Sequence, residues 1–308
     1  MAIDRCHRPL PAILLGLLVT ITFSAGCVPS PADKTIASPA PEIDWAKALR
    51  LGEVLFDLTN TYQITDEQLY AKYDTDATEV HLASTIFPGD TSPSRYMFIK
   101  EPGTGTQTVY LSGTNSQTMW QFNFDLISVY EPDLDAMVHR GFNNAALTVL
   151  DDLLPHMELG YKTTVAGFSL GGSMATLLAQ YLIINGYLVV DVVTFGQPKV
   201  TNQEGAPSFA NLPLLRFVNR NDVVPHLPPD DFVPPANLVH FGPEVILYDG
   251  PYYAYLEADD SDYLTSTSGD LLVITPLIFN NEHSNVYLAR IRSKLAGAQQ
   301  IPYLTQAP

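Results

Sequence analysis

Cysteine and basic residues are both scarce in this sequence. Its 308 residues include two cysteines, Cys6 and Cys27, both near the N-terminus. Removal of residues 1–26 would leave no pair able to form an intramolecular disulfide. Lys and Arg number 16 against 33 Asp and Glu, a formal net charge of −17. Binding to nucleic acid needs a basic face, so this balance argues against nucleic acid and favours solubility as the reason for the acidity.

The N-terminal segment lacks the length of a membrane-spanning helix. Its apolar run covers 14 residues, 10–23, and follows two arginines, whereas a spanning helix needs about 20. We therefore expect a signal peptide over residues 1–26. Residues 24–27 read Ser-Ala-Gly-Cys and resemble a bacterial lipobox, which predicts export, lipidation of Cys27 and attachment to the membrane of a cell envelope. Ordinary secretion and an uncleaved anchor are the alternatives.

The rest of the chain predicts one domain. Apolar residues make up 46% of the sequence, enough for a sizeable core. The proline-rich residues 27–44 read as a tether, and residues 45–308 as the domain. A helical pattern at 45–58, a β-hairpin at 94–100 and 107–112, and a helical pattern at 143–157 come first. Strands and helices then alternate: strands at 163–168, 187–195, 214–218 and 238–247, and helices at 171–185 and 284–296. This alternation predicts an α/β fold with a mainly parallel central sheet flanked by helices.

A glycine-flanked serine lies where one of these strands meets a helix. Residues 167–171 read Gly-Phe-Ser-Leu-Gly, with Ser169 at the centre. A nucleophilic serine on a sharp strand-to-helix turn needs small residues on both sides, which Gly167 and Gly171 supply. The helix N-terminus adds positive potential where an oxyanion would form. We therefore predict that Ser169 is a nucleophile; a simple glycine-rich turn is the alternative.

The other members of a catalytic triad are expected later in the chain, the acid before the histidine. Asp222 lies in the turn after the strand at 214–218 and is the favoured acid; Asp191, Asp230 and Asp231 are predicted to be structural. Of the three histidines that follow Asp222, His226 is too close in sequence and His240 is predicted to lie inside a strand. His283 lies in a polar turn before the last helix. We predict His283 as the general base, with helix capping as its alternative role.

Several motifs together resemble the class 3 lipase family, the fungal-type triacylglycerol lipases and their bacterial relatives. They are Gly113-Thr114, residues 138–142, 165–172, 194–198, 221–225 and 239–242, His283-Ser284 and Tyr287-Leu288. The resemblance implies an α/β-hydrolase fold, with an oxyanion hole formed by the backbone N–H groups of Thr114 and Leu170. It also implies that His139 is structural. Ser112 departs from the family pattern, which often has arginine before the Gly-Thr pair.

The same resemblance places a lid at residues 115–126. Trp120 and Phe122 make this segment unusually apolar, so it could cover the serine in water and face a lipid surface; ordinary core packing is the alternative. The expected activity is hydrolysis of lipid esters at a lipid–water interface, with no metal and no organic cofactor. A phospholipase A1, a feruloyl-type esterase, a serine peptidase and a non-catalytic envelope binding protein are the competing interpretations.

Overall fold

The computed structural model describes residues 39–60, 63–85, 94–113, 127–228, 238–257 and 282–303. All of these residues belong to one unit of the chain, Thr35–Pro308. Several predictions fall outside the described residues and stay predictions: the leader over 1–26, Cys27, Thr114, Trp120 and Phe122. Within the described part of the chain, no helix is both long and apolar enough to cross a membrane.

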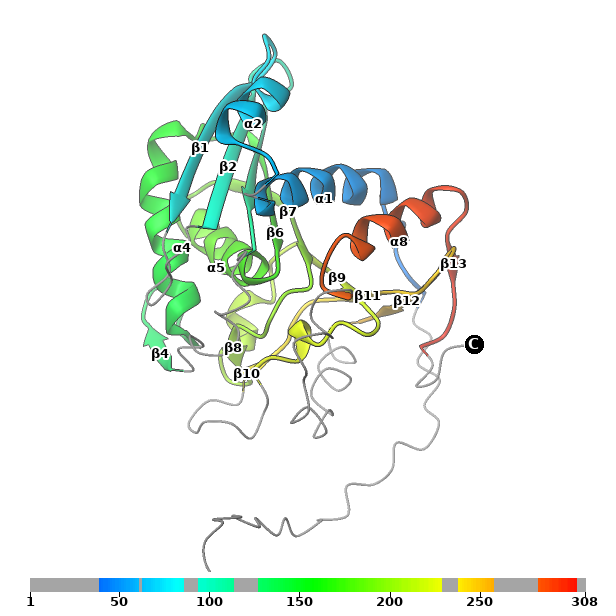
Figure 1. Cartoon of the computed structure of the whole chain (residues 1–308). Coiled ribbons are helices and arrows are strands. Elements are labelled where there is room, and N and C mark those ends of the chain that lie inside the picture. Colours follow the sequence, from blue (N-terminus) through cyan, green and yellow to red (C-terminus); the bar gives the residue numbers. More distant parts are fainter. Residues whose placement is uncertain are drawn as a thin grey trace, which may run out of the picture. The chain divides into compact units, whose positions relative to one another are not determined.

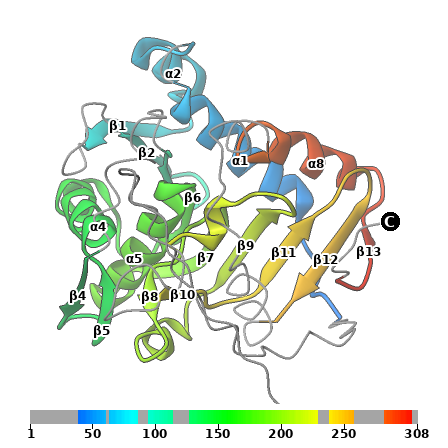
Figure 2. The same ribbon diagram turned by 60° about the horizontal axis from the view of Figure 1, so that its bottom comes forward.

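Nine strands of the described residues form one sheet, in the order β1-β2-β3-β6-β7-β9-β11-β12-β13 (Figures 1 and 2). From β3 to β11 neighbouring strands are parallel. The β1–β2, β2–β3 and β11–β12 pairs are antiparallel, and β12–β13 is parallel. The predicted mainly parallel α/β sheet is thus confirmed. The strand bounds are β1 Glu79–Thr85, β2 Ser94–Glu101, β3 Thr106–Leu111, β6 Lys162–Phe168, β7 Leu188–Phe195, β9 Leu214–Asn219, β11 Glu244–Leu247, β12 Tyr252–Leu256 and β13 Gln299–Gln300.

The predicted helices and the hairpin form close to their expected bounds. β2 and β3 pair antiparallel across the turn that contains Gly105, whose φ of 65° is a conformation that favours glycine. The helices are α1 Trp45–Thr59, α2 Asp66–Tyr73, α4 Arg140–Leu153, α5 Leu170–Ile184 and α8 Val286–Leu295, with short turns η1 Leu154–His156, η2 Ala206–Phe209 and η3 Val224–His226. The helical pattern predicted to run to residue 157 ends as an α-helix at Leu153, where η1 begins with Pro155 in its first turn.

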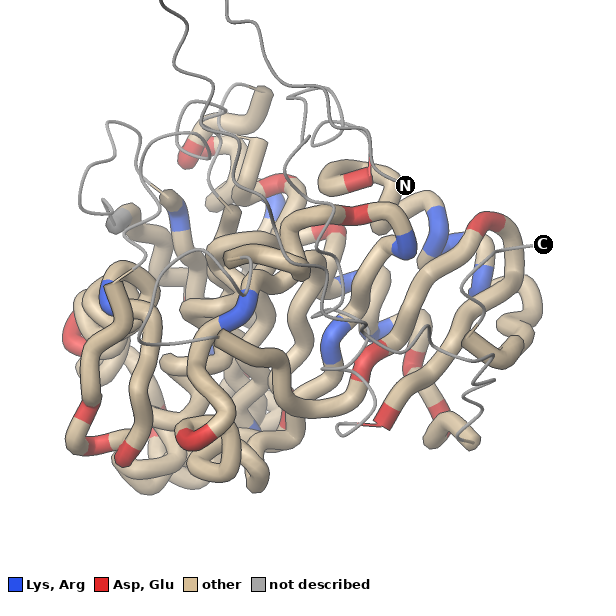
Figure 3. Tube along the Cα trace, turned by 90° about the horizontal axis from the view of Figure 1, so that it is seen from below, with Lys and Arg blue, Asp and Glu red and all other residues tan. Residues whose placement is uncertain are grey.

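Helices cover both faces of the sheet because successive strand residues point to opposite sides. On β2, Tyr96 and Phe98 join the core beneath α4 and α5, whereas Met97 and Ile99 join the core beneath α1 and α8. Figure 1 shows α1 and α8 side by side on their face. The acidic residues are spread along the described trace rather than gathered at one place (Figure 3), so the negative charge marks no single binding surface there.

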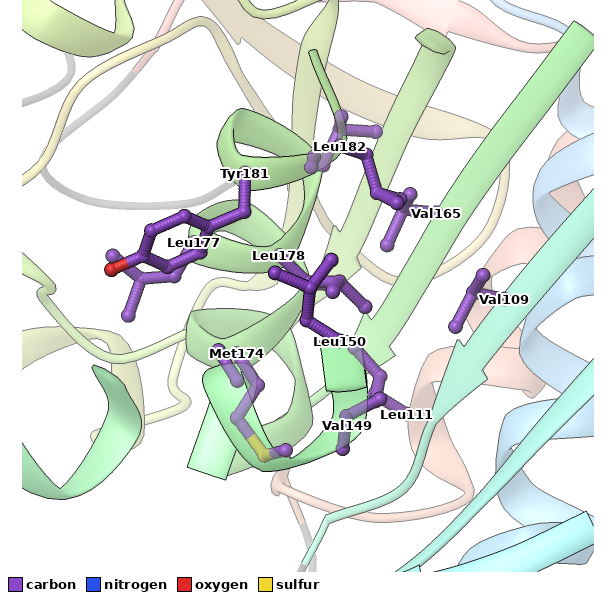
Figure 4. Close-up of a cluster of buried hydrophobic side chains, with 14 of the residues drawn as sticks. Val109, Leu111, Val149, Leu150, Val165, Met174, Leu177, Leu178, Tyr181 and Leu182 are labelled. Atoms are coloured by element: carbon purple, nitrogen blue, oxygen red, sulfur yellow. The ribbon is translucent and has the colours of Figure 1, made fainter. Parts of the chain in front are cut away.

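Helix α5 is buried around most of its circumference, which fits its sequence, apolar on almost every side. Figure 4 shows Leu178 and Leu182 of α5 on the side of the helix that faces Val165 of β6, whereas Tyr181 points away from that strand. Leu177, Leu178 and Leu182 have no exposed surface. Burial of a leucine side chain stabilises a fold by about 1.5–3 kcal/mol. The helix that follows Ser169 is therefore firmly anchored in the core.

The predicted single strand at 238–247 is wrong. The described structure breaks it into β10 Leu238–Val239 and β11 Glu244–Leu247, which lie in different sheets. Gly242, with a φ of 75°, lies in the turn between them, and a left-handed residue interrupts strand geometry. β10 belongs to a small four-stranded sheet with β8 Thr201–Asn202, β5 Ala136–His139 and β4 Ser128–Glu131. No sequence signal had indicated this second sheet.

Packing begins before Trp45, the predicted start of the domain. Ile43 is 9% exposed and belongs to the core under α1 and α8. The Asp44 side chain accepts a hydrogen bond from the Lys47 backbone N–H at 2.8 Å and so caps α1. The Ala40 N–H donates to Gln300 Oε1 at 3.1 Å. The last residues of the predicted tether therefore lie against the fold.

Candidate active site

Ser169 lies in the one-residue turn between β6 and α5. Its backbone has φ 57° and ψ −127°, a conformation that is strained for any residue other than glycine. Two backbone hydrogen bonds hold it there. The Ser169 N–H donates to Phe195 O of β7 at 2.8 Å, and the Gly172 N–H donates to Ser169 O at 2.8 Å. The fold therefore holds the serine backbone in one position between strand and helix.

The two glycines of the motif are required by the close approach of backbone segments. A Cβ atom on Gly167 would lie 2.1 Å from Gly171 O, and one on Gly171 would lie 2.1 Å from Leu111 O of β3. Both distances are far inside van der Waals contact, so any side chain would force strand and helix apart. The structural context predicted for the motif, strand then turn then helix, is present.

Asp222 and His283 meet at the end of β9. His283 Nδ1 lies 2.7 Å from Asp222 Oδ2. Asp222 is 1% exposed, and its other oxygen, Oδ1, accepts a hydrogen bond from the Val224 N–H at 2.9 Å. A buried carboxylate needs such donors to offset its lost hydration. The two residues predicted as acid and base are thus hydrogen-bonded, although 61 positions separate them.

Tyr287 is a third donor to this carboxylate, a role that was not predicted from the sequence. Its hydroxyl donates to Asp222 Oδ2 at 2.5 Å and accepts the Asn219 N–H at 3.1 Å. Burial, and then the charge of Asp222, raise the pKa of the Tyr287 hydroxyl well above its usual value. In the sequence, the indication that Tyr287 could reach this site was its position four residues after His283, at the start of α8.

The imidazole of His283 packs against Phe168 and Gly196. Its ring stacks on that of Phe168, the residue before Ser169, with centroids 4.7 Å apart. On another side, a Cβ atom on Gly196 would lie 2.8 Å from both Asp222 Oδ2 and His283 Cε1. Gly196 also has a φ of 60°. The motif Thr194-Phe195-Gly196 therefore includes a glycine that leaves room for the acid–base pair, a role missed from sequence.

Ser169 is itself almost fully buried, at 1% exposure. Within the described residues, its Oγ has no hydrogen-bond partner. Buried hydroxyl groups usually have one, so this oxygen stands out in the site.

The remaining predicted histidines have structural surroundings. His139 Nδ1 accepts the Phe142 N–H at 3.3 Å and caps the start of α4. His240 is 3% exposed, and its Nε2 lies 2.6 Å from Pro225 O. Burial lowers the pKa of His240 well below its usual value. His240 lies between β10 and β11, not inside a strand as predicted, but it is the satisfied core residue that the sequence suggested.

Of the three acids predicted to be structural, only Asp191 lies among the described residues. Asp191 lies within β7 and forms an ion pair with Lys47 of α1. Asp230 and Asp231 lie outside the described residues.

Of the two predicted oxyanion donors, Leu170 lies among the described residues. Leu170 is the first residue of α5, so its backbone N–H has no acceptor within the helix. Thr114 is not described, but its neighbour Gly113 is. A Cβ atom on Gly113 would lie 3.0 Å from both Ser169 Cβ and Phe168 Cδ1. The backbone that leads into Thr114 therefore passes against the serine turn.

No group of three or more His, Cys, Asp or Glu residues suited to a metal ion occurs among the described residues.

Comparison with known proteins gives consistent matches. The family described as lipase (class 3) matches residues 108–232, a range that includes Ser169 and Asp222. A lipase of Rhizomucor miehei is 33% identical over 168 residues, which cover 48% of this chain and 44% of that lipase. A chloroplastic phospholipase A1 of Arabidopsis thaliana is 31% identical over 130 residues, covering 39% of this chain and 18% of that protein.

The solved structure of lipase II from Rhizopus niveus has a TM-score of 0.56 at 20% identity and covers 77% of this chain and 93% of that one. At that identity the likeness shows the α/β-hydrolase fold. The aligned part spans less than half the length of each of the two sequence relatives. The serine turn and the fold agree with the family match, and residues 108–232 of the chain are similar to the class 3 lipase family.

Proposed function

We propose that this protein is a serine ester hydrolase that acts on lipid esters, with Ser169 as nucleophile, His283 as base and Asp222 as acid. The observation that supports this proposal most is the 2.7 Å hydrogen bond between Asp222 and His283. The imidazole of His283 also stacks on Phe168, the residue before Ser169. A buried serine in strained backbone at a helix N-terminus completes the arrangement of nucleophile, base and orienting acid.

The chemistry is acyl transfer in two steps. Ser169 Oγ forms a bond to the ester carbonyl carbon as His283 Nε2 takes the hydroxyl proton. Asp222 holds the proton on Nδ1 and stabilises the charged imidazolium. The tetrahedral intermediate collapses when His283 gives the proton to the leaving alkoxide, which departs as the alcohol. Water then attacks the acyl-serine by the same route and releases the acid.

The backbone N–H groups of Leu170 and Thr114 are proposed as the oxyanion hole. Leu170 N–H lies at the N-terminus of α5, where the helix dipole favours negative charge. In comparable sites the loss of one such donor costs about 3–4 kcal/mol of transition-state stabilisation. Gly167 and Gly171 allow the close packing that places this helix end beside the serine.

Lipid is the proposed ester because the sequence relatives include a lipase and a phospholipase A1. The segment 115–126, with Trp120 and Phe122, is proposed as a lid that turns its apolar side to a lipid–water interface. A phospholipase A1 activity is the second candidate, favoured by the Arabidopsis relative. A feruloyl-type esterase is a further alternative within the family, and a non-catalytic binding protein would have to leave the assembled site unused.

Export is proposed from the N-terminal residues. The basic start and short apolar run before Cys27 are typical of a signal peptide, and lipidation of Cys27 would attach the enzyme to a membrane. Expression of the full chain in a bacterium fed a palmitate analogue tests this. Labelling that is lost in Cys27→Ser supports the lipoprotein, and unlabelled protein in the medium supports ordinary secretion.

Reaction with a fluorophosphonate probe tests the nucleophile. We expect stoichiometric labelling of the wild type and none of Ser169→Ala. Ser173→Ala is the matched control, because Ser173 is a buried serine of α5, the helix that follows Ser169, and its hydroxyl donates to Pro198 O at 3.0 Å. This variant should label like the wild type. Probe addition to the wild type in detergent as well as in buffer allows for a closed lid, and absence of labelling in both would refute the proposal.

The substrate class is tested by rates on p-nitrophenyl esters and triglycerides of rising acyl length, and on phosphatidylcholine. Activity that increases with acyl length and with interface supports a lipase, and release of the sn-1 acyl chain from phosphatidylcholine supports a phospholipase A1. Activity confined to short soluble esters would contradict the lipid assignment without affecting the ester hydrolase itself.

A further inference from the structure

Arg95 of β2 is a buried arginine outside the set of residues proposed to carry the chemistry. It is 5% exposed and lies on the face of β2 that packs under α1. Within the described part of the chain its guanidinium makes four hydrogen bonds: Nε to Leu58 O at 2.9 Å, Nη2 to Asp57 O at 3.1 Å, and Nη1 to Ile64 O and Asp66 Oδ1, both at 3.0 Å. Three of the four acceptors are backbone carbonyl oxygens.

These acceptors fix the position of one helix end. Asp57 and Leu58 belong to the last turn of α1, whose carbonyl groups have no partner within the helix. A cation also interacts favourably with the negative end of the helix dipole. The planar guanidinium holds several carbonyls at once in a fixed geometry, which a flexible ammonium group does less well. Arg95 therefore sets where the C-terminal end of α1 lies relative to β2.

The end of α1 in turn contacts the strand that leads to the oxyanion hole. The hydroxyl of Thr59, the last residue of α1, donates to Leu55 O at 2.8 Å and accepts the Gly113 N–H at 3.3 Å. Arg95 also contacts this segment directly, because its own carbonyl accepts the Ser112 N–H at 3.0 Å. The backbone of Ser112 and Gly113 is thus held from two sides, by the backbone carbonyl of Arg95 and by Thr59. The Arg95 side chain acts on the second of these, through the end of α1.

A displacement of Gly113 would alter the position of the backbone next to the nucleophile and the proposed oxyanion hole. A Cβ atom on it would be 3.0 Å from Ser169 Cβ, and it is bonded directly to Thr114, a proposed oxyanion donor. An N–H group stabilises an oxyanion only within a narrow distance range, and misplacement by about 1 Å can cost about 100-fold in rate.

We propose that Arg95 is a positioning residue for the oxyanion hole, acting through the C-terminal end of α1 and Thr59 on Gly113. This inference rests on the proposed function. It assigns to a residue 74 positions before the nucleophile a specific effect on transition-state stabilisation, one distinct from a general effect on folding.

The test measures kcat and KM on a short soluble ester, p-nitrophenyl butyrate, for Arg95→Met, Arg95→Lys and Thr59→Val. Active sites are counted with the fluorophosphonate, so that kcat refers to folded enzyme only. Affinity for a trifluoromethyl ketone is measured as well, because Ser169 adds to its carbonyl and creates an oxyanion while His283 takes the proton.

For Arg95→Met we expect kcat per active site to fall about 10- to 100-fold with KM changed less than about threefold. Trifluoromethyl ketone affinity should fall by the same factor as kcat/KM. Arg95→Lys should recover part of the loss, since it keeps the charge without the fork. Thr59→Val, which removes only the hydroxyl next to Gly113, should lower kcat about three- to tenfold with the same parallel loss of ketone affinity.

Lys294→Met is the matched control. Lys294 is a buried cation of α8 that, like Arg95, donates to backbone carbonyls, those of Tyr248 and Gly250. Its loss should lower stability but leave kcat and ketone affinity per active site unchanged. If Arg95→Met gives no folded protein, the kcat and ketone affinity of Thr59→Val test the inference. Values within twofold of wild type for every folded Arg95 and Thr59 variant would overturn the inference, whereas a wild type without labelling or hydrolysis would overturn the proposed function instead.

Discussion

The substitution Tyr287→Phe removes one hydrogen-bond donor to Asp222. We expect it to lower the free energy of unfolding much more than it lowers the catalytic rate. The hydroxyl donates to a carboxylate that is 1% exposed, and a hydrogen bond to a charged group contributes about 1.5–3 kcal/mol. The change also leaves the Asn219 N–H, 3.1 Å from that oxygen, without its acceptor, at about 1–3 kcal/mol. We expect the free energy of unfolding to fall by about 3 kcal/mol.

The rate should change much less than the stability. Asp222 keeps the bond from His283 and the bond from the Val224 N–H, so it still fixes the orientation and tautomer of the imidazole. We therefore expect kcat per active site to fall by about tenfold or less. Urea unfolding and kinetics after active-site titration measure the two effects on the same sample.

Tyr181→Phe provides the control for loss of a hydroxyl. Tyr181 is a buried tyrosine of α5 whose hydroxyl donates to Asn143 Oδ1, a neutral acceptor, at 2.8 Å. Its loss should cost about 1 kcal/mol and leave the rate unchanged. A Tyr287→Phe enzyme that loses no more stability than Tyr181→Phe would refute the reasoning that the tyrosine offsets the burial of a charged carboxylate.

Alkaline pH gives a second measurement on the same variant. The pKa of Tyr287 lies well above its usual value, so the folded state keeps this proton above about pH 10, where the unfolded chain loses it. The wild type should therefore lose stability as pH rises above 10, by about 1.4 kcal/mol per pH unit for this group. Tyr287→Phe lacks that proton, so its stability should fall less steeply over the same range.

Two further predictions concern a glycine and a lysine. Gly196→Ala would place a Cβ atom 2.8 Å from both Asp222 Oδ2 and His283 Cε1 at a φ of 60°, so kcat per active site should fall at least about 100-fold; a near-normal rate would show that the pair tolerates displacement. Burial lowers the pKa of Lys294 to about 8, against about 10.4 for an unfolded lysine. Between these values the folded state binds fewer protons, so wild-type stability relative to Lys294→Met should rise from pH 8 to 10.4. A difference in unfolding free energy that stays flat over that range would contradict the lowered pKa.

Much of the fold was predictable because its signals are local. The β2–β3 hairpin, helices α1, α4, α5 and α8, and the parallel strands follow from apolar spacing and turn residues close together in sequence. The strand at 238–247 was mispredicted because its apolar pattern says nothing about the sheet to which each half belongs. The small sheet joins strands of two to four residues, too short to produce an alternating pattern.

The amino-acid sequence by itself determined which residues carry the proposed chemistry. Ser169, Asp222 and His283 stand out because each has a chemical type and a local position, at the end of a strand or in a turn, that an ester hydrolase needs. The tertiary structure alone decided how these residues are held. Tyr287 reaches Asp222 across 65 positions, and Arg95 reaches the end of α1 across 37. Hydrogen bonds of this kind depend on which elements the sheet order brings together, and no local pattern encodes that order.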